Sequence, residues 1–201
     1  MALHDQTIRD VSRTLLDLLK NNLPTVPVDL LSPKSPGANL LTLFLYKVLE
    51  NPDFKNAPAP VPITTNNQGG LVETRAPLTV DLYYLLTAHS GATNLLAAHT
   101  ALSSAMRVFY DNGVLQGSLL RSNDPSTGLT ADSTLRLTLN PITMEDMTRI
   151  WSVFPDTPYE ISVSYLVTPV PIESARVQES APVVDQFHEY GQDGAELVGS
   201  T

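Results

Sequence analysis

The side chains that could carry out chemistry in this chain do not form a catalytic pattern. Cysteine is absent, which excludes disulfides, thiolate zinc sites and thiol nucleophiles together. The histidines His4, His89, His99 and His188 show neither HExxH nor HxH spacing, so the sequence predicts no metal site. His89 is followed directly by Ser90, but adjacent residues cannot place a hydroxyl and an imidazole in the geometry of a catalytic triad. We therefore expect no catalytic residues.

Other loop and acidic patterns that could bind ligands are incomplete. Residues 66–70 are rich in Asn and Gly, but no GxxxxGK[ST] or GxGxxG motif follows a strand there. Residues 123–128 resemble a calcium loop in part, yet the acidic residue that closes such a loop is missing. Glu73 and Asp81 lack the partner carboxylate that a glycosidase requires. Turns and strand ends are the better interpretation, and no cofactor is expected.

The charge of the chain argues against nucleic acid as a partner. The formal net charge is -9 at pH 7, and no basic stripe occurs, so phosphate groups would be repelled. Only 16% of the residues are charged, compared with roughly 25% in typical soluble domains. A surface with so few charges favours a protein that assembles with others. Because no signal peptide and no membrane-spanning run is evident, we expect a chain made in the cytoplasm without membrane contact.

Apolar periodicity predicts the elements that position these side chains. Two runs, 40–51 and 76–88, are predicted as strands buried on both faces. The other predicted elements are helices over 5–20, 93–110 and from Thr143 to Phe154, and strands over 26–31, 129–139 and 159–167. Trp151 is expected to anchor the third helix on the sheet. This order predicts an α+β domain over residues 1–175, with a mixed, mostly antiparallel sheet and three packed helices.

Two segments are expected to project from this domain. Residues 52–70 contain four prolines and end in two glycines, so they should be extended and exposed. Residues 176–201 form an acidic, flexible tail that should order on a neighbouring molecule. The arm and the tail are natural donors in an interface between subunits. The basic residues expected to accept acidic groups in such an interface are Arg75, Arg107, Arg121 and Arg136.

Several motifs follow one another in an order that resembles a known family. They are residues 43–51, the block RAPLTVDLYYLLTA at 75–88, Ala105-Met106-Arg107, residues 135–139, and Ile150-Trp151 before the strand at 159–165. The chain resembles the cap, or tube-terminator, family of extracellular contractile injection systems. These are phage-tail-like particles typified by virulence cassettes and antifeeding prophages. The resemblance covers residues 5–175 and is most specific at 77–88 and at the Trp151-to-Tyr165 ending.

The resemblance implies a fold similar to phage tail terminators and a structural role without catalysis. It implies a homo-oligomeric ring, expected to be a hexamer, that terminates the inner tube and contacts the end of the sheath. Inner-tube protein and sheath protein are the expected partners, in a particle that can be released after assembly. The expected subunit, tube or sheath contacts are Pro58, Pro60, Asn66, Asn67, Arg75, Arg121, Asp185, Phe187 and Tyr190.

Two alternative functions stay open at this point. A terminator of an ordinary contractile phage tail would share the same sequence features, and only the neighbouring genes would distinguish it. A small-ligand or hydrolase α+β domain is a third hypothesis, which would need His89, Ser90 and Asp81 to lie close together.

Overall fold

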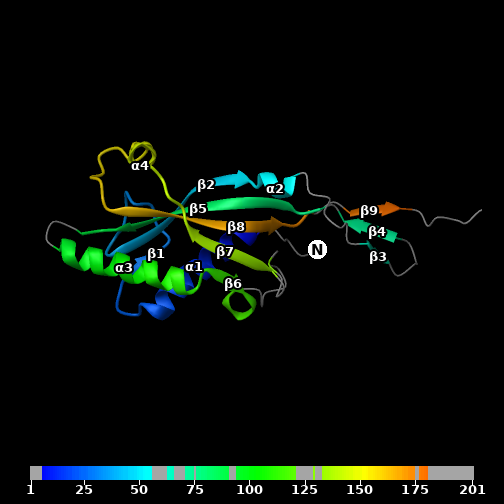
Figure 1. The fold of residues 1–201 in the computed structure, drawn as a ribbon, viewed down its shortest axis with the longest axis horizontal. Helices are drawn as coiled ribbons and strands as arrows, with labels where there is room; N and C mark the ends of the chain where they lie inside the picture. Colours follow the sequence, from blue (N-terminus) through cyan, green and yellow to red (C-terminus); the bar gives the residue numbers. More distant parts are fainter. Residues whose placement is uncertain are drawn as a thin grey trace, which may run out of the picture.

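A six-stranded, mostly antiparallel sheet is the centre of the fold in the computed structural model (Figure 1). The model describes residues 6–55, 63–65, 71–74, 76–90, 94–120, 129, 133–174 and 177–180. The strands of this sheet are β1 (Val28–Asp29), β2 (Leu41–Glu50), β5 (Leu78–Ala88), β6 (Val114–Gln116), β7 (Thr134–Leu139) and β8 (Ser162–Ile172). Their spatial order is β1-β2-β5-β8-β7-β6, and only the β1–β2 pair is parallel. The predicted α+β class with a mixed, mostly antiparallel sheet is confirmed.

Helices cover the two faces of the sheet unequally. Helices α1 (Thr7–Asn22) and α3 (Leu95–Asp111) pack on one face, and α4 (Met144–Trp151) lies on the other (Figure 1). Alternation along β5 divides its side chains between these two layers. Tyr84 and Leu86 join the core under α1 and α3, while Leu85 joins a smaller core under α4. The three predicted helices are confirmed.

Strand β2 differs from the prediction of burial on both faces. That prediction holds for most of β5, but Val48 and Leu49 in β2 are each 43% exposed. The reason is tertiary: β1 pairs only with Leu41 and Thr42, so the rest of β2 is an edge within the described residues. Not every apolar helix residue is buried, since Leu96 in α3 and Met144 in α4 are exposed.

Local start and stop signals place helix α4 and strand β8. The Asp146 amide donates to Thr143 Oγ1 at 3.1 Å, so Thr143 caps the start of α4, where the predicted helix begins. Strand β8 begins later than predicted, at Ser162, and continues past Val167 through two prolines to Ile172. Pairing with β7 ends at Thr168, so Pro169 and Pro171 lie where that side of β8 faces no described strand. Proline is tolerated at such an edge because its missing N–H removes no ladder bond.

Several short elements were not predicted. Residues 52–55 form the helix α2 (Pro52–Lys55), so the prediction of extended chain is wrong there. Strand β6 and the 3₁₀ helix η1 (Gly117–Leu119) follow α3. A second sheet contains β3 (Ile63–Thr65), β4 (Leu71–Thr74) and β9 (Val177–Ser180) in the order β3-β4-β9, and Figure 1 shows it beyond the ends of β5 and β8. Strand β9 falls within the predicted tail, whose residues 181–201 lie outside the described part.

We expect two buried tyrosines to make the folded state less stable at alkaline pH. Burial raises the pKa of Tyr84 far above its ordinary value of 10.0, and raises the pKa of Tyr165 to about 12. The folded state therefore holds both protons more tightly than the unfolded state, so stabilisation is complete below pH 10.0 and is lost as the pH rises through the folded pKa values. We expect the free energy of unfolding, measured by urea titration, to fall from about pH 10 upward.

Replacing both hydroxyls provides the control for this prediction. The double variant Tyr84→Phe/Tyr165→Phe should lose most of the alkaline dependence, while an exposed Tyr110→Phe variant should keep it. The Tyr84 hydroxyl lies 2.7 Å from Ser12 Oγ, so its removal should also lower the stability at neutral pH by about 1 kcal/mol. An unchanged alkaline profile in the double variant would contradict the assignment.

Candidate interaction surfaces

Of the three residues in the hydrolase hypothesis, Asp81 lies far from the adjacent His89 and Ser90. Asp81 is near the start of β5, whereas His89 follows its end, and eight residues of strand span about 26 Å. His89 Nε2 lies 2.8 Å from Thr42 Oγ1, and burial lowers the pKa of His89 despite the nearby carboxylate of Glu160. Ser90 donates a hydrogen bond to Glu160 at 3.1 Å. Asp81, His89 and Ser90 therefore do not form a catalytic triad.

The described part of the chain offers no site for a metal ion and no helix that could span a membrane. There, no group of three or more His, Asp or Glu side chains is placed to hold a metal ion. Within the same residues, no helix combines the length and apolar character needed to cross a bilayer.

The residues predicted as an assembly interface all lie outside the described residues. They are Pro58, Pro60, Asn66, Asn67, Arg75, Arg121, Asp185, Phe187 and Tyr190. Their roles stay predictions. Of the four basic residues expected to accept acidic groups, Arg107 on α3 and Arg136 on β7 are described, and both are exposed.

A buried polar network attaches α2 to the sheet. Asn51 Nδ2 donates to Asp81 Oδ1 at 2.8 Å and to Thr168 Oγ1 at 3.1 Å, and Thr168 also donates to Asp81. The Asn51 Oδ1 atom accepts from the amides of Asp53 and Phe54 at 3.0 and 3.2 Å. Asn51 thus caps α2 through its Oδ1 atom, while its Nδ2 group is bound to Asp81 at the β-bulge of β5. Sequence reasoning missed this network, although an Asn followed by Pro52 is a helix-start signal.

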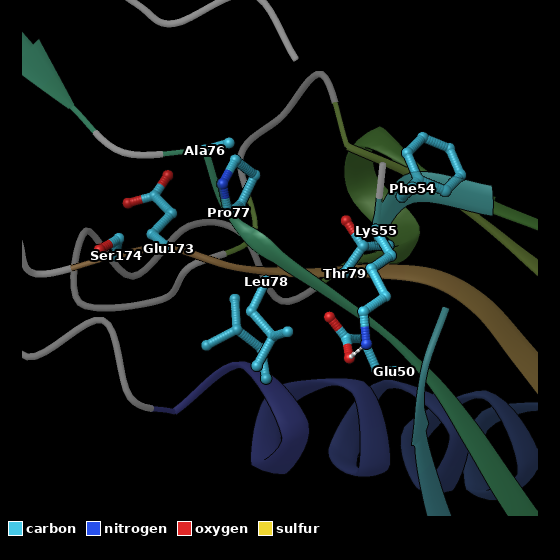
Figure 2. Close-up of a pocket in the computed structure, with 10 residues that line it drawn as sticks. Glu50, Phe54, Lys55, Ala76, Pro77, Leu78, Thr79, Glu173 and Ser174 are labelled. Carbon is cyan, nitrogen blue, oxygen red and sulfur yellow. Dashed lines mark hydrogen bonds and ion pairs between the residues drawn. The ribbon is translucent and has the colours of Figure 1, made fainter. Parts of the chain in front are cut away.

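A first hollow lies between α2 and the start of β5 (Figure 2). Lys55 Nζ lies 2.9 Å from Glu50 Oε2, and this hydrogen bond raises the pKa of Lys55. Figure 2 shows Lys55 turned toward Glu50, while the Phe54 ring points away from that ion pair. Phe54 is 52% exposed and Leu78 is 49% exposed. The hollow has a volume of about 480 Å³ and is lined by Glu50, Phe54, Lys55, Ala76, Pro77, Leu78, Thr79, Ile172, Glu173 and Ser174.

The second hollow, which we call the α3–β7 groove, lies on the side of the sheet near β6. Its floor contains Phe109 and Tyr165, whose rings meet edge to face with centroids 4.9 Å apart. Its rim includes Tyr110, Val114 and Leu139, which are 87%, 44% and 51% exposed. The groove has a volume of about 800 Å³, and its lining is Met106, Arg107, Phe109, Tyr110, Gly113, Val114, Leu137, Thr138, Leu139 and Tyr165. Arg107 is the charged residue in this otherwise mostly apolar lining.

The third hollow lies under α4 on the opposite face, with a volume of about 680 Å³. Tyr46, Lys47 and Tyr83 line it, and Lys47 Nζ lies 4.9 Å from the centroid of the Tyr83 ring. Tyr46 is fixed by a 2.8 Å hydrogen bond between its hydroxyl and Ser164. These three surfaces offer apolar and aromatic contacts rather than reactive groups, which suits binding to other proteins.

Known proteins similar to this chain share its fold. The family model described as "Pvc16 N-terminal domain" matches residues 10–186. A sheath/tube terminator of an extracellular contractile injection system (PVC), solved in the extended state, has a TM-score of 0.65 and 18% sequence identity, covering 95% of this chain and 65% of that chain. The tube-terminating cap of the anti-feeding prophage (AFP) has a TM-score of 0.61 and 18% identity, covering 94% and 61%. This chain therefore spans less than two thirds of either protein. No curated protein sequence matches it.

Proposed function

Because the chain belongs to the Pvc16 N-terminal domain family, we propose that it is a structural cap of a contractile injection system. In this role it terminates the inner tube and contacts the end of the sheath. The observation that carries the proposal is the fold shared with a sheath/tube terminator over 95% of the chain. The role requires no enzyme activity, in agreement with the separation of Asp81 from His89 and Ser90 along β5.

We further propose that the cap is a ring of six identical subunits. A closed ring uses a heterologous interface, in which one patch of each subunit contacts a different patch of the next. The low charge content and the apolar hollows on opposite faces support such contacts. The predicted contacts in residues 52–70 and 176–201, together with Arg75 and Arg121, remain candidates for binding the neighbouring subunit, the tube protein or the sheath protein.

The proposed setting is a particle assembled in the bacterial cytoplasm and then released. A terminator of an ordinary contractile phage tail is the second candidate. Both similar structures, one from an extracellular contractile injection system and the other from an anti-feeding prophage, favour the first candidate.

Removal of the chain from a producing strain tests the proposal. We expect particles without it to show tubes and sheaths of irregular length, because nothing terminates their growth, as judged by electron microscopy. Re-expression of the chain should restore uniform, capped particles. The purified protein should also form a complex of six times the chain mass of 21.8 kDa, alone or with tube protein, by light scattering. Uniform capped particles in the absence of the chain would overturn the proposal.

A further inference from the structure

Two exposed features of this chain are complementary in apolar character and charge, and they lie on different edges of the main sheet. One is helix α2, which presents Phe54, and the other is the α3–β7 groove. We propose that α2 of one subunit docks in the α3–β7 groove of the next, with Phe54 as the inserted side chain. This inference rests on the ring proposed above and assigns the contact that closes it.

Phe54 is an exposed apolar residue whose backbone is held in a fixed position. It is a large apolar side chain that is 52% exposed, and it sits on a single helical turn. Asn51 holds that turn through the amides of Asp53 and Phe54, and is itself tied to the buried Asp81. A side chain on a fixed element loses little conformational freedom on binding, so its burial contributes more fully to affinity.

The α3–β7 groove is a suitable receptor for an aromatic ring. Its floor is rigid, because Phe109 and Tyr165 are 1% and 4% exposed and are packed against each other. Its rim exposes Tyr110 and Leu139 to solvent. Aromatic rings prefer edge-to-face and offset contacts with one another, which Tyr110 can provide to an incoming Phe54.

Opposite charges next to Phe54 and in the groove favour this pairing. Asp53 precedes Phe54, and Arg107 lines the groove; both are exposed, and neither has an ion-pair partner among the described residues. Lys55, by contrast, is already paired with Glu50. Asp111, the acid next to Tyr110, is not part of the groove lining. Docking would bring Asp53 toward Arg107, and opposite charges at an interface fix register and speed association.

The positions of the two features suit contact between subunits rather than within one. Helix α2 follows β2, while the groove lies on β7, and β5 and β8 stand between these strands. Three strand spacings amount to about 14 Å, far beyond the reach of one side chain. The two patches differ from one another and lie toward opposite edges of the sheet. A contact between them is therefore heterologous, as a cyclic ring requires.

Engineered cysteines test this contact directly, since the chain has none of its own. We expect the Phe54→Cys/Leu139→Cys double variant, oxidised as the assembled protein, to give a ladder of covalent oligomers up to the ring size on a non-reducing gel. Each single variant should give no ladder beyond a dimer. The matched control Phe54→Cys/Leu96→Cys, with the second cysteine at an exposed position on the other end of α3, should also give none.

A charge exchange gives a second readout that does not depend on cysteine. Asp53→Arg and Arg107→Glu should each lower the fraction of ring at least tenfold, and the combined variant should restore it. A combined variant that assembles no better than the single variants would overturn the pairing.

The outcomes separate this contact from the proposed function. A ring of normal mass in the wild-type chain, without a ladder from Phe54→Cys/Leu139→Cys, would overturn the contact and leave the cap intact. A ladder from Leu139→Cys/Phe187→Cys instead would assign the groove to the C-terminal segment. Failure of the wild-type chain to form any ring, with or without tube protein, would overturn the proposed function and this contact together.

Discussion

Replacement of Trp151 by Ala is expected to lower the free energy of unfolding by about 3–5 kcal/mol. This side chain is 7% exposed and is buried with Leu85, Met147 and Phe154 in the small core that joins α4 to the sheet. Its ring also meets Phe154 and Tyr159 edge to face, with centroids 6.0 and 5.4 Å away. The loss is large because so small a core cannot close over the cavity left by the indole.

Urea titration followed by circular dichroism measures this loss. Val153→Ala is the matched control, since Val153 is 66% exposed and should cost less than about 0.5 kcal/mol. Trp151→Phe should cost less than Trp151→Ala, because the indole Nε1 finds no hydrogen-bond acceptor among the described residues and its removal relieves that penalty. The wild-type emission should be blue-shifted from this single Trp. A loss below about 1 kcal/mol for Trp151→Ala would place the side chain on the surface.

Replacement of Phe109 by Ala should be equally costly, at about 3–5 kcal/mol, but in the larger core. Phe109 is 1% exposed on the inner side of α3, and its ring packs edge to face on Tyr165 of β8. The adjacent Tyr110→Ala is the control: Tyr110 is 87% exposed, so its loss should change monomer stability by less than about 0.5 kcal/mol.

The two variants should differ in a second respect. Phe109→Ala should unfold early in thermal or urea denaturation, whereas Tyr110→Ala should stay folded and form the ring less well, because Tyr110 lies on the rim of the α3–β7 groove. Equal stability losses for both variants would contradict the assignment of Phe109 to the core and of Tyr110 to the surface.

Local patterns in the sequence determined much of the fold. The three-to-four-residue spacing of Val11, Leu15 and Leu18 identified α1, and the Thr143 cap placed the start of α4. The apolar run of β5 correctly indicated a strand between two layers, because a strand covered on both faces needs no polar alternation. The motif succession also identified the family, which the match over residues 10–186 confirms. The signals for the helices and strands each lie within a short stretch of chain, whereas the family resemblance extends over most of the domain.

Pairing between distant segments decided the rest. Composition alone could not show that β1 leaves most of β2 at an edge, since this depends on how many residues of β1 reach it. In the sequence, Asp81 is an acid without an evident partner. In the fold, it lies at the bulge of β5 and accepts hydrogen bonds from Asn51 and Thr168. The α3–β7 groove likewise exists only because the packing of α3 on β7 places Tyr110 and Leu139 along the same hollow. Local periodicity thus identified the helices and strands, and a resemblance in the order of motifs identified the family. Contacts between distant segments decided which surfaces are exposed, because exposure depends on which segments cover one another.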